Sequence, residues 1–130
     1  MKITSAMVRN IRKAVNAIRP GRIIEVGVRG WEGMSDRAGE NYLLWGPGND
    51  LEYTELVQFI AGREIDDFHG FVALDLYLYT FGENGELDTN AYVVLDPSGE
   101  VIYATDDDIG SRKGTREALA KRGVKWNNEN

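Results

Sequence analysis

Hydrophobic positions recur along the chain with two different periods, and these periods predict where helices and strands form. Near the start, Met7, Ile11 and Val15 are spaced by four residues, which is typical of one buried face of a helix. The helix should end at Arg19, because a residue that precedes proline, here Pro20, is disfavoured in helical geometry. The pattern therefore predicts an amphipathic N-terminal helix with a basic outer face.

Alternation with a period of two predicts strands, most strongly over residues 71–81. One face of that segment is aliphatic and consists of Val72, Leu74, Leu76 and Leu78. The other face is aromatic and consists of Phe71, Tyr77, Tyr79 and Phe81, with Asp75 among them. Further strands are predicted at residues 22–29, 41–45, 89–95 and 100–105. Asn84-Gly85 and the turn from Asp96 to Gly99 join the last three strands into a meander.

Two more helices complete the predicted elements. A middle helix should begin at Asn49 or Asp50 and end at Gly62, and a short basic helix should run from about residue 111 to a stop at Gly123. The element order predicts an α+β fold: an antiparallel sheet with a C-terminal three-strand meander, packed by the N-terminal, middle and C-terminal helices. We expect one domain over residues 1–126, followed by a polar tail at 127–130.

Composition excludes several kinds of chemistry. The 130 residues include no cysteine, which rules out disulfides, thiolate metal sites and thiol catalysis. No apolar run approaches the roughly 20 residues that a membrane span needs, and the first residues do not resemble a signal peptide. We therefore expect a cytoplasmic protein with no membrane partner.

The net charge of −6 conceals a strong segregation of charge along the chain. Residues 1–37 carry +5, residues 38–110 carry −15 and residues 111–130 carry +4. Two interpretations follow. Either the basic ends pack against the acidic middle segment and partly neutralise it, or the acidic segment is presented to a partner with a basic surface.

Two acidic runs are candidate contacts for such a partner: Glu64, Asp66 and Asp67, and then Asp106, Asp107 and Asp108. The first run, together with His69, also suits a divalent metal, although consecutive residues rarely point at one ion. The second lacks the spaced ligands and central glycine of a calcium-binding loop. We interpret both runs as solvated charge and predict no metal and no cofactor.

The aromatic face of residues 71–81 is a further candidate contact surface. If helices cover only the aliphatic face, then Asp75, Tyr77, Tyr79 and Phe81 would meet a partner protein or a second copy of the chain. The alternative is that other elements of the chain cover this second face.

Catalytic and nucleic-acid-binding motifs are weak. His69 is the only histidine, and no serine lies in a nucleophile elbow, so we assign no catalytic residue. The basic first helix could meet phosphates, but sixteen acidic residues at 38–110 oppose this, and we do not expect direct binding of nucleic acid.

Together these observations favour a non-catalytic protein-binding module. The hypothesis is a small acidic antagonist, of the phage or mobile-element type that acts against CRISPR or restriction systems, which binds the basic surface of a nucleic-acid-handling protein. A small carboxylate-based or metal-dependent enzyme and a nucleic-acid binder that uses the first helix remain the alternatives.

Overall fold

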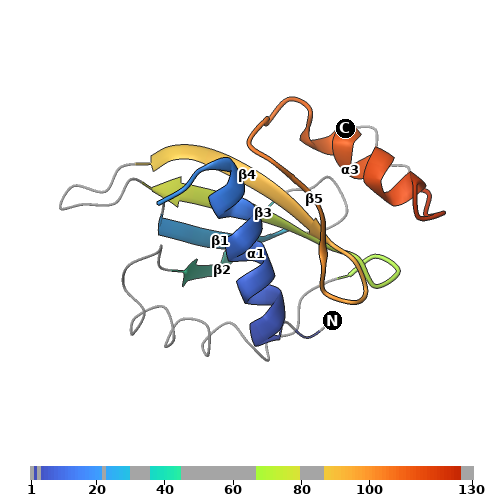
Figure 1. Ribbon diagram of the computed structural model, residues 1–130, viewed down its shortest axis with the longest axis horizontal. Coiled ribbons are helices and arrows are strands. Elements are labelled where there is room, and N and C mark those ends of the chain that lie inside the picture. Colours follow the sequence, from blue (N-terminus) through green and yellow to red (C-terminus); the bar gives the residue numbers. More distant parts are fainter. Residues whose placement is uncertain are drawn as a thin grey trace.

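The computed structural model describes residues 2, 4–21, 23–29, 36–44, 67–79 and 87–126 (Figure 1). The elements are α1 (Ser5–Ile18), β1 (Ile23–Arg29), β2 (Asp36–Leu44), β3 (Val72–Tyr79), β4 (Leu87–Leu95), β5 (Val101–Thr105) and α3 (Ser111–Ala120). The predicted middle helix and the predicted turn at Asn84-Gly85 lie outside the described residues.

The strands form one antiparallel sheet in the order β2-β1-β3-β4-β5, so that β3 lies at its centre (Figure 1). The α+β class is therefore confirmed, and β3, β4 and β5 pair in sequence order. β2 begins at Asp36, whereas the sequence predicted a strand only from residue 41. Backbone pairing explains the difference, because Asp36 lies opposite Arg29 of β1 and the hydrogen bonds between the two strands do not require alternating apolar side chains.

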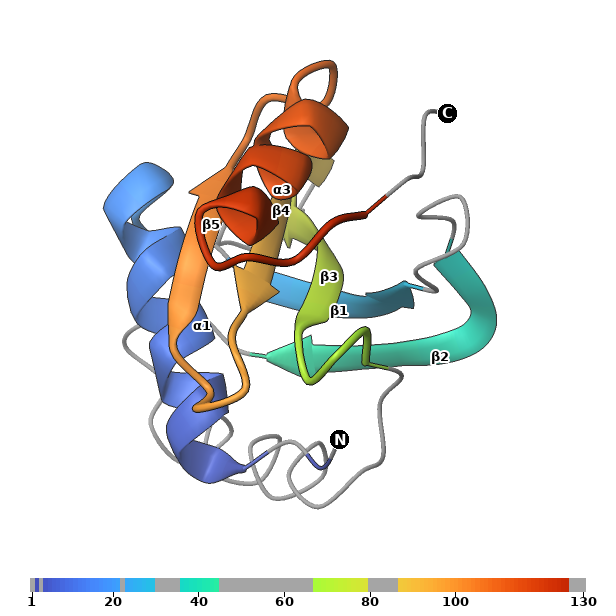
Figure 2. The ribbon, with the colours of Figure 1, turned by 90° about the vertical axis from the view of Figure 1, so that its right-hand side faces the viewer.

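α1 covers one face of the sheet (Figure 2). Its first turn is capped by Thr4, whose Oγ1 accepts a hydrogen bond from the backbone N–H of Met7 at 3.2 Å. The buried side chains of this layer come from α1 and from β1, β3 and β4: Met7, Val8, Ile11, Val15, Ile24, Val72, Leu74, Leu76, Leu78, Ala91, Val93 and Leu95. The predicted aliphatic face of β3 is thus the main core of the protein.

α3 and the segment after it lie on the opposite face, as the side view in Figure 2 shows. Leu119 and Trp126 pack there against Phe71, Ala73 and Val94. Phe71 is only 5% exposed, so this end of the aromatic face is covered by the chain itself. Of the two sequence-based interpretations of this face, covering by other elements is the correct one at the Phe71 end.

The β4–β5 connection is the predicted turn, and Asp96 organises it. The N–H of Gly99 donates to the carbonyl oxygen of Asp96 at 2.9 Å, and Gly99 adopts a φ of 89°. The carboxylate of Asp96 accepts hydrogen bonds from the Ser98 hydroxyl at 2.6 Å and from the N–H groups of Ser98 and Glu100 at 2.9 and 3.0 Å. One ionised side chain therefore satisfies three donors in this hairpin.

Acid should weaken the fold partly through Asp96. Partial burial raises the pKa of Asp96, but the hydrogen bonds from Ser98 and Glu100 outweigh it and lower this pKa below its usual 3.8. A carboxyl group whose pKa is lower in the folded state stabilises the protein above its unfolded pKa, and this contribution is lost as the pH falls through the folded pKa. The urea midpoint should therefore fall on acidification below about pH 4, and Asp96→Asn should flatten part of that fall. An unchanged pH profile in Asp96→Asn would contradict this role.

Candidate partner-binding site

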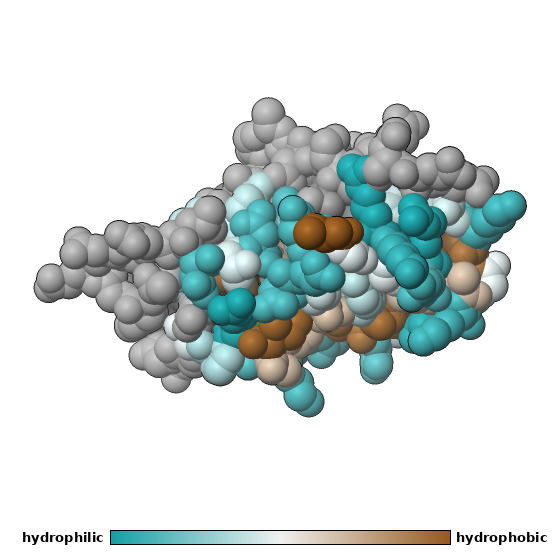
Figure 3. Space-filling model, turned by 90° about the horizontal axis from the view of Figure 1, so that it is seen from above, coloured by the Kyte–Doolittle hydropathy of each residue, from teal (hydrophilic) through white to brown (hydrophobic). Residues whose placement is uncertain are grey.

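The connection from β5 to α3 combines negative charge with an exposed apolar side chain. We call residues 106–110 the acidic loop. Asp107 and Asp108 are exposed, and Ile109, which follows them, is 95% exposed. Among the residues that the structure describes, Ile109 is the large hydrophobic residue that is exposed. The coloured part of the face seen from above in Figure 3 is largely hydrophilic, with apolar residues at a few places between the polar ones.

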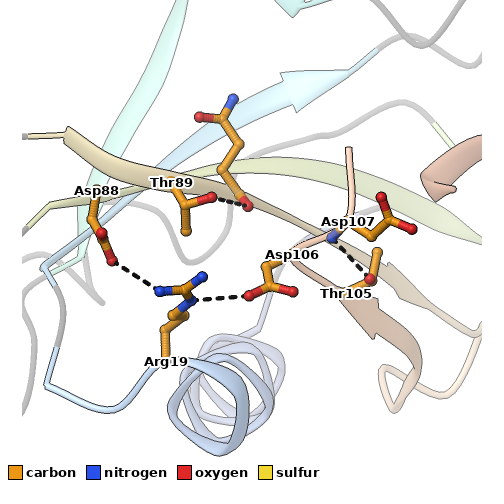
Figure 4. A network of polar contacts seen from close by, with 7 residues as sticks. Arg19, Asp88, Thr89, Thr105, Asp106 and Asp107 are labelled. Atoms are coloured by element: carbon orange, nitrogen blue, oxygen red, sulfur yellow. Dashed lines mark hydrogen bonds and ion pairs between the residues drawn. The ribbon is translucent and has the colours of Figure 1, made fainter. Parts of the chain in front are cut away.

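Local hydrogen bonds hold the acidic loop in one conformation. The backbone N–H of Asp107 donates to Oγ1 of Thr105 at 3.0 Å (Figure 4). Oδ1 of Asp107 then accepts from the N–H of Ile109 at 3.1 Å, which is the Asx-type turn that aspartate favours. These two bonds fix the backbone directly before and at Ile109, so its side chain projects from an ordered turn.

Contacts with β4 and with α3 also hold the acidic loop in place. Tyr92 of β4 is 3% exposed, and its hydroxyl donates to Oδ1 of Asp108. The Ser111 hydroxyl donates to the carbonyl oxygen of Asp108 at 3.0 Å, where α3 begins. Ser111 is itself buried, at 3% exposure. The loop is therefore tied to both elements between which it runs and to the neighbouring strand.

Arg19, just after α1, lies between the carboxylates of Asp88 in β4 and Asp106 in the acidic loop (Figure 4). Its Nε is 2.9 Å from Oδ2 of Asp106, and its Nη1 is 3.6 Å from Oδ2 of Asp88. The basic N-terminal part of the chain therefore neutralises some of the acidic middle segment. A single guanidinium cannot balance both carboxylates, and Asp107 and Asp108 are further acidic groups in the same loop.

A hollow of about 400 Å³ adjoins the acidic loop on the side of β4. Its described lining is polar and consists of Asp88, Thr89, Asn90, Tyr92, Asp106 and Asp108. Within the described residues, acidic and histidine side chains form no group of three or more that could hold a metal ion. Asp106 and Asp108 belong both to the acidic loop and to this lining, so the hollow extends the acidic surface around the loop.

The other sequence-predicted contact residues do not join this surface. Asp75 is buried at 3% exposure in the central strand, opposite Gly27 and Tyr92, and a partner cannot reach it from outside. Tyr77 and Tyr79 are half-buried on the same face. The remaining predicted residues, Phe81, Glu64 and Asp66, lie outside the described residues.

Asp67 lies in a different turn from the acidic loop. Phe68 and Phe71 exchange two backbone hydrogen bonds, of 2.9 and 3.0 Å, around His69 and Gly70, which have φ values of 53° and 87°. Positive φ at both central residues is typical of a two-residue hairpin turn. The Gly70 N–H donates to Oδ2 of Asp67 at 2.8 Å, and this bond is the main reason that the pKa of Asp67 is lowered.

Asp67 and the acidic loop lie toward opposite ends of β4. Asp67 precedes β3, whose first residue, Val72, lies opposite the end of β4 at Leu95. Asp106 follows Thr105, which lies opposite Tyr92, earlier in β4. The acidic loop alone combines exposed charge with an exposed apolar side chain among the residues that the structure describes.

Sequence reasoning missed Ile109 as a contact residue. A signal was present, because this isoleucine follows three consecutive aspartates, precedes a glycine and belongs to no periodic apolar pattern. An apolar residue among turn-forming residues belongs to no apolar face of a helix or strand, so its sequence context does not place it in the core.

Comparison with protein families, with curated proteins and with solved structures finds no match to this chain. Within the described ranges, no helix has both the length and the apolar character that crossing a bilayer requires.

Proposed function

We propose that the protein is a non-catalytic binding module whose acidic loop docks on a partner protein with a basic surface. The observation that carries the proposal is Ile109, 95% exposed on a hydrogen-bonded turn directly after Asp107 and Asp108. An apolar side chain can fill a pocket at the centre of an interface, while charges around it steer association and select the partner.

The rigidity of the loop supports the same function. Binding is weakened by the entropy lost when flexible groups become ordered. Here Thr105, Tyr92 and Ser111 already fix the loop backbone and the Asp108 carboxylate. The partner would therefore meet a turn that is already in its binding conformation.

The chemistry of the partner follows from the charge. Proteins that handle nucleic acids carry basic surfaces that neutralise phosphates. An acidic module bound to such a surface would exclude the nucleic acid, and this is the form of antagonism that we propose. Phage or mobile-element inhibitors of CRISPR or restriction systems act on partners of this kind.

Replacing Ile109 with alanine should weaken partner binding at least tenfold without unfolding the protein, because truncating a central apolar contact costs about 2 kcal/mol or more. The measurement is quantitative mass spectrometry of the proteins retained by the immobilised wild type and by the variant. Lys113→Ala is the matched control, because Lys113 is an exposed residue of α3. A partner retained equally by the wild type and by Ile109→Ala would overturn the proposal.

Charge has a separate signature in the same experiment. Asp107→Asn with Asp108→Asn keeps oxygen acceptors at both positions but removes two negative charges. Retention of the partner should then fall at low salt and depend less on salt than in the wild type, because screening acts on exposed charges. An unchanged salt dependence would remove the two carboxylates from the binding surface.

A further inference from the structure

β5 is an edge strand whose outer side pairs with no other strand among the described residues. All five of its residues are half-buried, whereas residues 91–95 of the neighbouring β4 are fully buried. An open edge presents backbone N–H and C=O groups that can pair with another chain. Lysine, proline and inward-pointing charge usually block such edges, and Val101–Thr105 contains none of these.

A groove runs beside this edge, between β5 and α1. Its volume is about 410 Å³, and its described lining consists of Asn10, Lys13, Ala14, Ala17, Glu100 and Val101. The two alanines and Val101 leave room for a side chain, and Lys13 and Glu100 supply polar groups. The Asn10 amide donates to the carbonyl oxygen of Gly99 at 3.0 Å, which ties the helix to the start of β5. Figure 2 shows β5 between α1 and α3.

We infer that a partner adds an extended segment to the outer edge of β5 and places one of its side chains in the groove between β5 and α1. Strand addition of this kind gains affinity from backbone hydrogen bonds and specificity from pockets for alternate side chains. The inference rests on the proposed function and names the segment of the partner that is recognised.

The charges at the two ends of β5 indicate which residues the partner's added segment should carry. Glu100 directly precedes the strand and Asp106 directly follows it. Asp106 shares the single guanidinium of Arg19 with Asp88, so this end of β5 keeps a net negative charge. An added segment with a basic residue on each side of its central part would therefore meet a carboxylate at each end, in either direction. Lysine or arginine flanking a β-branched stretch is the chemistry that this edge fits.

The same charges disfavour a second copy of the chain. If two β5 strands paired around a twofold axis through Tyr103, Glu100 of one copy would lie near Asp106 of the other, at both ends. Like charges opposite each other destabilise strand pairing. A basic partner is therefore favoured over a homodimer at this edge.

The acetylated and amidated peptide Lys-Val-Thr-Val-Thr-Val-Lys is a suitable probe. At saturation it should slow hydrogen exchange of the β5 amides at least tenfold, as followed by NMR. The same peptide with every backbone nitrogen between its two lysines N-methylated cannot donate hydrogen bonds from either edge of that stretch and should give no protection. Equal protection by the methylated peptide, or protection confined to other elements, would overturn the inference. Replacing both lysines with glutamate should weaken binding at least tenfold.

Variants of α1 test the groove. Ala17→Phe should fill it and weaken peptide binding at least tenfold. Ala6→Phe is the matched control, since Ala6 is an exposed alanine of the same helix but does not line the groove. Equal affinity of Ala17→Phe and Ala6→Phe for the peptide would contradict a role for the groove.

Protection of β5 that grows with protein concentration, without peptide, would show a second copy as the occupant and would also overturn the inference.

The outcomes separate this inference from the proposed function. If Ile109→Ala abolishes partner retention while the peptide leaves β5 unprotected, the acidic loop binds the partner and strand addition is wrong. If the peptide protects β5 while Ile109→Ala retains the partner fully, strand addition holds and the acidic loop is not the binding surface.

Discussion

Leu76→Ala should lower the free energy of unfolding by about 2–5 kcal/mol, the largest effect that we expect from a single substitution. Leu76 is fully buried in the central strand, opposite Val26 and Ala91, and belongs to the core beneath α1. The alanine would leave a cavity where the surrounding side chains cannot fully close. Because small domains are stable by roughly 5–15 kcal/mol, such a loss would shift the urea midpoint substantially.

Ile109→Ala is the control for this prediction. It removes a branched aliphatic side chain of the same size, but at 95% exposure, and should change the free energy of unfolding by about 0.5 kcal/mol or less. Circular dichroism during urea unfolding measures both variants. Similar losses in the two would contradict the assignment of Leu76 to the core and of Ile109 to the surface.

Gly114→Ala should also destabilise the protein, although alanine favours helices by up to about 1 kcal/mol over glycine. Gly114 lies in α3 where the helix crosses Tyr103 of β5. A Cβ atom at this position would overlap the hydroxyl oxygen and Cζ of Tyr103. The ring or the helix would have to move, at a cost of about 1–3 kcal/mol, which outweighs the gain in helix propensity.

A double substitution tests this explanation. In a Tyr103→Leu background the clash is removed, so Gly114→Ala should become neutral or stabilising, as measured by urea unfolding of the four proteins in the cycle. A loss that persists in the Tyr103→Leu background would place the cause elsewhere in α3. A shift of α3 in Gly114→Ala should also affect partner binding, because α3 begins directly after the acidic loop and Ser111 holds the loop backbone.

Most strands could be predicted because apolar residues alternate along them in the sequence. Alternation over 71–81 marked β3, and the turn at Asp96 separated β4 from β5, where the hydrogen bonds of Asp96 and Gly99 confirm it. β2 was predicted too short, because its first residues pair through the backbone and carry no apolar alternation. A hydrophobic pattern in the sequence indicates which side chains are buried, but it does not show which backbone segments pair.

The candidate site was predictable in part. The aspartate run at 106–108 was identified from charge alone, but Ile109 was overlooked and Asp75 was assigned to the surface. Asp75 alternates with aromatic residues, and this pattern was interpreted as a strand face that a partner could contact. In the structure β1 and β4 flank β3, and Asp75 is buried. Exposure depends on which strands are neighbours, and spacing along one strand does not contain that information.

By itself the sequence determined the helices at both ends, the alternating strands, the turn chemistry and the segregation of charge, since each depends on residues close together in the chain. The tertiary structure alone decided that β1 lies beside β3, that α3 covers the Phe71 end of the aromatic face and that Arg19 reaches Asp88 and Asp106. Among the described residues, it also left the outer edge of β5 unpaired beside α1. These features join residues that are distant in sequence, and the free energy that selects them comes from burying whole faces together.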